Sequence, residues 1–152
     1  MLELIYEYRK LTRGDTRLYK GVKETLEKLS KEYDIYLASY TQGSYSLREL
    51  EELEIRQYFT GFVFSSDLGY RKMSNNFYQK CISISGTTKE NCVMIGDNKL
   101  EDMYTANNNG MKTIWVKNPI TENDHSNIDI NPNGEVSINS FYELYDIIET
   151  IK

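Results

Sequence analysis

Cysteine, long apolar runs and positive charge are all scarce in this sequence, and each scarcity excludes a class of protein. The two cysteines, Cys81 and Cys92, lack the spacing of a zinc site or a disulfide framework, so we expect reduced, buried side chains. No apolar stretch approaches the about 20 residues of a membrane span. The N-terminal MLELIYEYRK also carries acids, unlike a secretory signal. We therefore expect a soluble, cytoplasmic protein with no membrane partner.

Basic residues are outnumbered, since 18 Lys and Arg stand against 23 Asp and Glu, for a net charge of −5. They are scattered, and no basic run is interleaved with aromatic residues as in a nucleic-acid groove. We therefore expect no nucleic-acid partner. The single histidine, His125, lies among polar residues, so an exposed bystander is a better interpretation than a catalytic base.

Helix and strand patterns alternate along the chain. The apolar spacing predicts helices at 3–10, 21–31, 45–55, 75–85 and 99–109, and a final helix capped by Asn139 or Ser140. Strands are predicted at 35–39, 62–66, 92–96, 113–116 and near 135–138. The polar segment 118–134 predicts a long surface loop. This order predicts an α/β fold with a parallel, doubly wound sheet, and 152 residues suffice for one such domain.

The most informative segment is CVMIGDNKLEDM at 92–103, in which a short buried strand ends at Gly96 and Asp97. Asp102 follows five positions later, in the first turns of a predicted helix, and can turn back toward the same cleft. Two carboxylates at one point suit Mg²⁺, which takes one or two of them together with waters and substrate phosphate. The spacing favours a metal site for phosphoryl chemistry over helix capping, although Asp is also a common cap.

Useful side chains also follow two other predicted strands. Ser39 ends the strand IYLAS, and its hydroxyl, with the backbone N–H groups from Tyr40 onward, can bind a phosphate oxygen. Lys72 follows the strand and turn FSSDLGYR, where an ammonium can neutralise an anionic intermediate. The carboxyl ends of parallel strands meet at one edge, so these groups are expected near Asp97 and Asp102.

Together these residues resemble the haloacid dehalogenase-like (HAD) superfamily, whose members are mostly Mg²⁺-dependent phosphatases. The resemblance extends from about residue 18 to residue 116. Ser39 matches the hydroxyl that ends the family's second motif, Lys72 matches the third motif, and GD-x4-D at 96–102 matches the fourth. Thr41 is a rival for the second-motif hydroxyl, but Ser39 ends the strand and lies at the family's usual distance from Phe59.

The resemblance implies a Rossmann-like three-layer core with a mostly parallel sheet, and a small phosphorylated substrate. It implies that Ser39 and Tyr40 bind the phosphoryl group, that Lys72 binds and stabilises it during catalysis, and that Asp97 and Asp102 hold Mg²⁺. Residues 18–117 would form the core, and 1–17 a remnant of the helical cap or a linker. The loop 118–134 would lead to a terminal strand and helix at 135–152.

One family motif has no match, since no apolar strand ending in D-x-D occurs in these 152 residues. In the family the first of those aspartates attacks phosphorus and the second acts as general acid and base. Asp15, the only early candidate, follows polar and basic residues, so a turn role is the better interpretation. We therefore expect no turnover from this chain alone.

The missing motif also implies a missing strand, which in the family lies between the strand of Ser39 and the strand of Asp97. Unpaired buried backbone groups cost about 1 to 3 kcal/mol each, so something must fill the gap. An upstream segment or a second chain can supply the strand, or the flanking strands can pair directly. The fourth and least favoured alternative is that LELIYEY near the N-terminus forms it.

The leading hypothesis is therefore a HAD-like hydrolase, a phosphatase for a small metabolite that works through an aspartyl-phosphate, with the nucleophile outside the 152 residues. The alternatives are a noncatalytic binding or regulatory module of the same fold, and one half of a two-chain enzyme. Dehalogenase activity also occurs in the family, and the sequence does not separate it from phosphatase activity.

Overall fold

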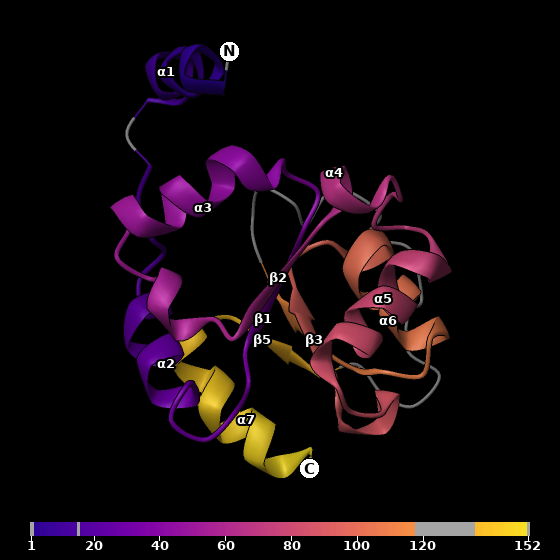
Figure 1. Cartoon of the computed structure of the whole chain (residues 1–152). Helices are drawn as coiled ribbons and strands as arrows, with labels where there is room; N and C mark the ends of the chain where they lie inside the picture. The colour runs from indigo at the N-terminus through magenta and orange to yellow at the C-terminus, as the bar shows by residue number, and fades with distance from the viewer. Residues whose placement is uncertain (1, 15, 118–135, 152) are drawn as a thin grey trace.

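Parallel strand pairing organises the chain (Figure 1). The computed structural model describes residues 2–14, 16–117 and 136–151. In chain order the elements are α1 (Leu2–Arg13), α2 (Val22–Leu29), β1 (Tyr36–Ser39), α3 (Gly43–Glu52), η1 (Arg56–Tyr58), β2 (Gly61–Phe64), α4 (Ser65–Leu68), α5 (Asn75–Ser85), η2 (Lys89–Asn91), β3 (Val93–Gly96), η3 (Lys99–Tyr104), α6 (Thr105–Asn108), β4 (Lys112–Val116), β5 (Ser137–Ile138), η4 (Phe141–Glu143) and α7 (Leu144–Thr150). The alternation and the parallel pairing confirm the predicted α/β class.

The described strands form two sheets, where the sequence predicted one. β1 pairs with β2, with Tyr36 opposite Gly61 and Ser39 opposite Phe64. β3, β4 and β5 form the second sheet in that order. Within the described ranges β1 and β3 do not pair, so the alternative in which the flanking strands close the gap directly is wrong.

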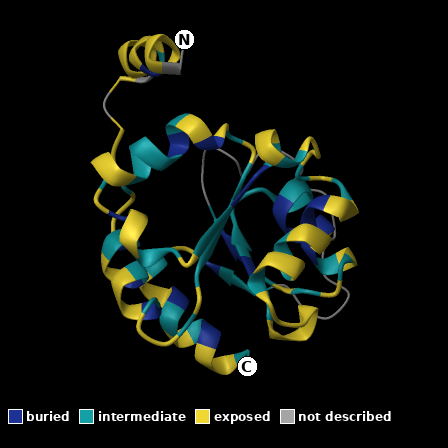
Figure 2. Cartoon of the chain, in the orientation of Figure 1, coloured by how far each residue is buried: buried dark blue, intermediate teal, exposed yellow. Residues whose placement is uncertain are grey.

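Helices lie on both sides of the strands, with α2 and α7 on one side and α5 and α6 on the other (Figures 1 and 2). Each side has its own buried apolar cluster. The cluster beneath α5 and α6 consists of Val63, Phe77, Tyr78, Met94, Met103, Ala106 and Trp115. The cluster beneath α2 and α7 consists of Leu29, Ile114, Val116, Ile138, Leu144 and Ile148. Successive residues of β4 enter alternate clusters, which is the pleat of a strand buried on both faces.

Capping residues explain the boundaries that the sequence predicted well. α5 begins and ends as predicted, because the Ser74 hydroxyl accepts a hydrogen bond from Phe77 N and Gly86 adopts the left-handed conformation with φ 68°. The final helical segment is capped by Ser140, whose hydroxyl accepts from Tyr142 N.

Two predictions differ from the structure, and two others concern residues that it does not describe. The strand predicted at 62–66 ends two residues early, because Ser65 begins the four-residue helix α4. The helix predicted at 99–109 is divided into a π-helix, η3, and the short helix α6. The predicted loop 118–134, with His125, and the predicted turn at Asp15 fall outside the described residues.

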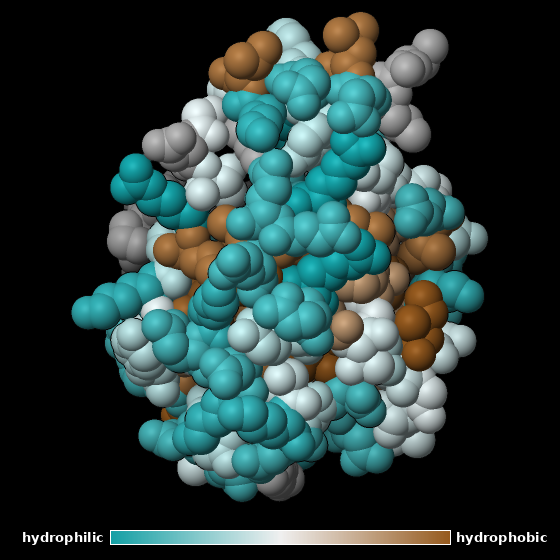
Figure 3. All heavy atoms as spheres, turned by 60° about the vertical axis from the view of Figure 1, so that its left-hand side comes forward, coloured by the Kyte–Doolittle hydropathy of each residue, from teal (hydrophilic) through white to brown (hydrophobic). Residues whose placement is uncertain are grey.

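α1 is a helix, so the alternative in which LELIYEY supplies a central strand is wrong. It is held to α3 by polar contacts: Tyr6 bonds Glu52, and the Arg9 guanidinium lies 2.7 Å from the Glu49 carboxylate. The outer side chains Leu4 and Leu11 are 75% and 82% exposed, and Figure 3 shows apolar atoms at the top of the molecule, over α1. No helix in the described part of the chain combines the length and apolar character needed to cross a membrane.

Candidate active site

Asp102 lies deep in the molecule, at 3% exposure, because its helix starts as a π-helix directly after β3. The carbonyl of Asn98 accepts from Asp102 N at 2.9 Å and from Met103 N, five residues on, at 3.3 Å. This wider turn directs Asp102 back over the strand end, where Gly96 has no side chain. A Cβ at position 96 would lie 2.2 Å from Asp102 Oδ2, so only glycine admits the carboxylate here.

The Asp102 carboxylate has two partners. The Lys72 ammonium forms an ion pair with Oδ1, and the side chains of Lys72 and Asp102 are 13% and 4% exposed. The backbone N–H of Asn98 donates to Oδ2 at 3.2 Å. Oδ1 accepts no well-aligned hydrogen bond from the described residues, so its contact with Lys72 is chiefly electrostatic. Asp102 is thus both a helix-start residue and the anionic partner of Lys72.

Tyr78 holds the backbone of this turn by a hydrogen bond from its side chain. It is fully buried, and its hydroxyl donates to the Glu101 carbonyl at 2.8 Å, with the Asp102 carbonyl 3.4 Å away. Burial, and then the negative charge of Asp102, raise the pKa of Tyr78 far above its ordinary value. Tyr78 therefore stays a neutral donor that fixes the backbone of η3.

Asp97 follows the end of β3 and is half-buried. Its carbonyl accepts a hydrogen bond from Trp115 Nε1 at 3.1 Å, which ties it to the neighbouring strand β4. Lys99 lies over the Trp115 ring, 4.0 Å from its centre. Asp97, Asp102 and Lys72 line the same cavity, so the structure brings together three of the predicted site residues.

The two candidate hydroxyls after β1 belong to one hydrogen-bonded chain. The Ser46 hydroxyl donates to Thr41 Oγ1 at 2.6 Å, and Thr41 Oγ1 lies 2.9 Å from Ser39 Oγ. Thr41 N also donates to Ser39 Oγ, at 3.3 Å. Ser39 does not line the cavity of Lys72 and the two acids, and Tyr40 lines a different one.

That first cavity, of about 890 Å³, lies between the two sheets. It is lined by the adjacent edges of β1 and β3 and, from the helices on either side, by apolar residues that include Leu26, Leu29, Cys81, Ile82 and Ile148. All four residues of β1 are only half-buried, although parallel strands between helix layers normally bury both faces. A five-residue strand, at about 3.3 Å per residue, 4.8 Å between strands and 10 Å between layers, takes up roughly 800 Å³. We call this cavity the strand slot.

The cysteines are consistent with a reduced state. Cys81 and Cys92 are both free thiols and half-buried, which is less burial than the sequence predicted. Cys81 lines the strand slot, and burial raises the pKa of its thiol to about 11.

The carboxylates near the end of β3 are the kind of ligand that Mg²⁺ prefers, but they are too few to complete its coordination shell. The described residues contain no cluster of three or more His, Cys, Asp and Glu side chains able to hold a metal ion. Asp97 and Asp102 provide two hard oxygen donors at one strand end, and Mg²⁺ commonly takes no more than that from protein, completing its shell with water and phosphate.

Comparisons with known proteins agree on one family. The sequence profile of the haloacid dehalogenase-like hydrolases matches residues 2–116. The pyrimidine 5′-nucleotidase PynA of Streptococcus pneumoniae is 30% identical over 146 residues, which cover 95% of this chain and 59% of the relative. The glyceraldehyde 3-phosphate phosphatase of Pyrococcus furiosus is 29% identical over 100 residues, covering 64% of this chain and 41% of the relative.

Comparison with solved structures finds the same fold. The magnesium-bound HAD hydrolase YfnB from Bacillus subtilis superposes with a TM-score of 0.73 at 20% identity, over 87% of this chain and 55% of that one. The chain therefore spans about half the length of these three proteins.

Proposed function

Because the chain belongs to the haloacid dehalogenase-like hydrolases, we propose that it is the core of a Mg²⁺-dependent phosphatase acting on a small phosphorylated metabolite. The observation that carries this proposal is the buried contact between Lys72 and Asp102 at the end of β3. The named activities of the two curated relatives, both on phosphate esters, favour phosphatase over dehalogenase chemistry. A cytoplasmic setting and a single core domain over the whole chain stay predictions from the sequence.

In this proposal each polar group around the strand ends has a role. Lys72, already paired with Asp102, binds a phosphoryl oxygen and offsets the negative charge that grows on it. Asp97 and Asp102 hold Mg²⁺, which when bound neutralises phosphate charge and orients the group for attack.

The hydroxyl chain favours Ser39 over Thr41 as the phosphate donor. Thr41 Oγ1 accepts the Ser46 proton, and Ser39 Oγ accepts from Thr41 N. If the Thr41 hydroxyl in turn donates its hydrogen bond to Ser39 Oγ, the Ser39 hydroxyl is left to donate to a phosphoryl oxygen. Backbone N–H groups from Tyr40 onward complete this side of the phosphate site.

The strand slot is where we place the nucleophile. A parallel strand between β1 and β3 would pair with both edges, and its carboxyl end would lie beside Asp97 and Lys72. Such a strand ending in D-x-D would deliver the attacking carboxylate to the phosphoryl group. A preceding segment of the same polypeptide is a better source than a second chain, since each of the two matched relatives is a single longer chain, of which the aligned part is only 41% or 59%.

The second candidate function is a noncatalytic module, or half of a two-chain enzyme, and it is favoured by one observation. None of the 152 residues forms a D-x-D motif, so the described groups can bind a phosphate but have no assigned nucleophile. A strand-binding module of this kind would present the same slot to a partner.

The test is complementation with a strand. Hydrolysis of 4-nitrophenyl phosphate with Mg²⁺ is measured for the 152-residue chain alone, and with a peptide of the D-x-D strand of the pneumococcal relative. We expect no turnover alone and Mg²⁺-dependent turnover with the peptide. A peptide with the first Asp changed to Asn should bind equally but restore nothing.

Two results would count against the proposal. Turnover by the chain alone that is lost in Asp97→Asn would place the nucleophile within these residues. Peptide binding without turnover would favour the noncatalytic module.

A further inference from the structure

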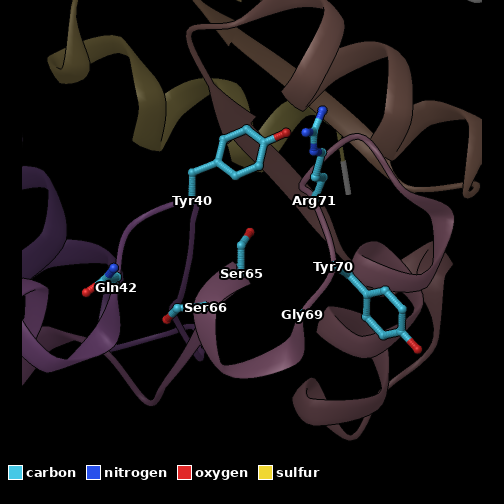
Figure 4. Close-up of a pocket in the computed structure, with 7 residues that line it drawn as sticks. All are labelled: Tyr40, Gln42, Ser65, Ser66, Gly69, Tyr70 and Arg71. Atoms are coloured by element: carbon cyan, nitrogen blue, oxygen red, sulfur yellow. The ribbon is translucent and has the colours of Figure 1, made fainter.

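We propose that the cavity beside the phosphate site, lined by Tyr40, Ser65 and Arg71, binds a carboxylate on the leaving group of the substrate (Figure 4). This rests on the proposed function and names its substrate class. The substrate would be a short phosphorylated hydroxy acid, in which a carboxylate lies close to the phosphate ester.

Three polar side chains converge on this cavity of about 630 Å³. In Figure 4 the Tyr40 hydroxyl and the Arg71 guanidinium point into the same space, and the Ser65 hydroxyl points toward it from below. Tyr70, on the same loop as Arg71, points away. The groups come from parts of the chain that are far apart in sequence: Tyr40 follows β1, whereas Ser65 begins α4 and Arg71 lies in the loop after it.

All three groups lack a partner within the residues that the structure describes. Ser65 Oγ is buried and has no hydrogen-bond partner there. Arg71 forms no ion pair or hydrogen bond with another described residue, and neither does the Tyr40 side chain. A buried hydroxyl without a partner costs roughly 1 to 3 kcal/mol, so a ligand that accepts from it is favoured.

The donors select for an anion. A guanidinium offers several N–H donors in a planar fork, and two hydroxyls add two more. A carboxylate accepts a guanidinium through two parallel hydrogen bonds, which gives geometric specificity as well as affinity. Asp67, an acid of the preceding helix α4, accepts from the Ser66 hydroxyl at 2.8 Å and forms no ion pair with Arg71.

The position of the cavity sets the size of the substrate. Arg71 directly precedes Lys72, and Tyr40 directly follows Ser39. Each of these two loops therefore carries one residue of the proposed phosphate site, Lys72 or Ser39, and one residue of the cavity, Arg71 or Tyr40. Neighbouring Cα atoms are about 3.8 Å apart, and here Lys72 turns toward Asp102 while Arg71 turns toward the cavity. This adjacency along both loops favours a substrate with a short leaving group, which could reach the cavity while its phosphate stays near Lys72.

The test uses a matched pair of ligands, 2-phosphoglycolate and ethyl phosphate, which share the phosphate ester and differ in the carboxylate. Binding of each to the chain is measured by calorimetry with Mg²⁺ present. We expect 2-phosphoglycolate to bind about tenfold or more tightly. Arg71→Gln should remove most of that preference, and Tyr40→Phe and Ser65→Ala smaller parts of it. Lys80→Gln, which removes an exposed cation on α5, should leave it unchanged.

The possible failures are distinct. Equal binding of the two ligands to the wild-type chain would overturn the carboxylate site and leave the phosphate site intact. A preference that survives Arg71→Gln would overturn the assignment to this cavity. Binding of neither ligand would overturn the phosphate site and this inference together.

Discussion

The Asp102 carboxylate occupies the space in which a side chain at Gly96 would lie, with Oδ2 only 2.2 Å from the position of a Cβ. Gly96→Ala should therefore displace the carboxylate from Lys72 and from Asn98 N. We expect a loss of about 2 kcal/mol in the free energy of unfolding, typical of overpacking, measured by urea denaturation.

The matched control repeats the substitution in an Asp102→Gly background, which removes all three nearest atoms. Gly96→Ala should then cost much less. An equal cost in both backgrounds would show that the carboxylate is not the obstacle.

Lys72→Met should destabilise the protein by about 3 kcal/mol, because it leaves the buried Asp102 carboxylate without its cation. Adding Asp102→Asn to the Lys72→Met variant removes the unpaired negative charge and should recover much of the lost stability. A double-mutant cycle in urea measures this coupling. Additive effects of the two substitutions would contradict the buried ion pair.

Tyr78→Phe should loosen the π-helix that presents Asp102. The substitution leaves the Glu101 carbonyl without its donor, at an expected cost of about 1 to 2 kcal/mol. Hydrogen exchange at the amides of η3 should quicken. Tyr104→Phe is the control, since Tyr104 lies in the same π-helix but is 44% exposed. Equal effects of the two changes would show that the buried hydroxyl has no special role.

The Cys81 thiol should react slowly with iodoacetamide until strongly alkaline pH, because burial raises its pKa to about 11. In a Cys92→Ser background, the rate at pH 8 should be roughly a hundredfold below that of the chain unfolded in urea, whose thiol has a pKa of about 8.5. The rate of the folded chain should keep rising between pH 9 and pH 11. A plateau near pH 9 would contradict the buried environment.

The raised pKa of Cys81 also predicts how the stability of the fold changes with pH. The folded state keeps the thiol proton at a pH where the unfolded state releases it, so the contribution of Cys81 is complete below about pH 8.5. It declines as the pH rises toward about 11. Cys81→Ala should flatten this part of the stability profile.

Helices whose ends are set by residues within or next to them were predicted well from the sequence. α5 is bounded by a capping serine and a glycine in the left-handed conformation, and both are visible in the sequence. The π-helix was not predictable, because its wide turn depends on the space over Gly96 and on the Tyr78 hydroxyl beneath it. α4 was missed because its four residues are too few to show a helical apolar period, and the first two were assigned to the preceding strand, although Gly69, left-handed at φ 69°, marks its end.

The order of the motifs along the chain predicted which candidate side chains lie together. Lys72 and Asp102, thirty positions apart, were both assigned to the cleft and are in contact. Arg71, which we propose binds a carboxylate, was not predicted, because the direction of its side chain depends on the loop after α4 and no sequence spacing indicates it. The only signal was its place beside Lys72.

The division of the sheet affects how this chain behaves at high concentration. β1 and β3 each have one edge without a neighbouring strand among the described residues, and the apolar walls between them are partly open. Open edges of this kind pair readily with strands of other molecules, including further copies of the same chain. We therefore expect the chain to self-associate through these edges at high concentration, and less so when a strand such as the one we propose occupies the slot.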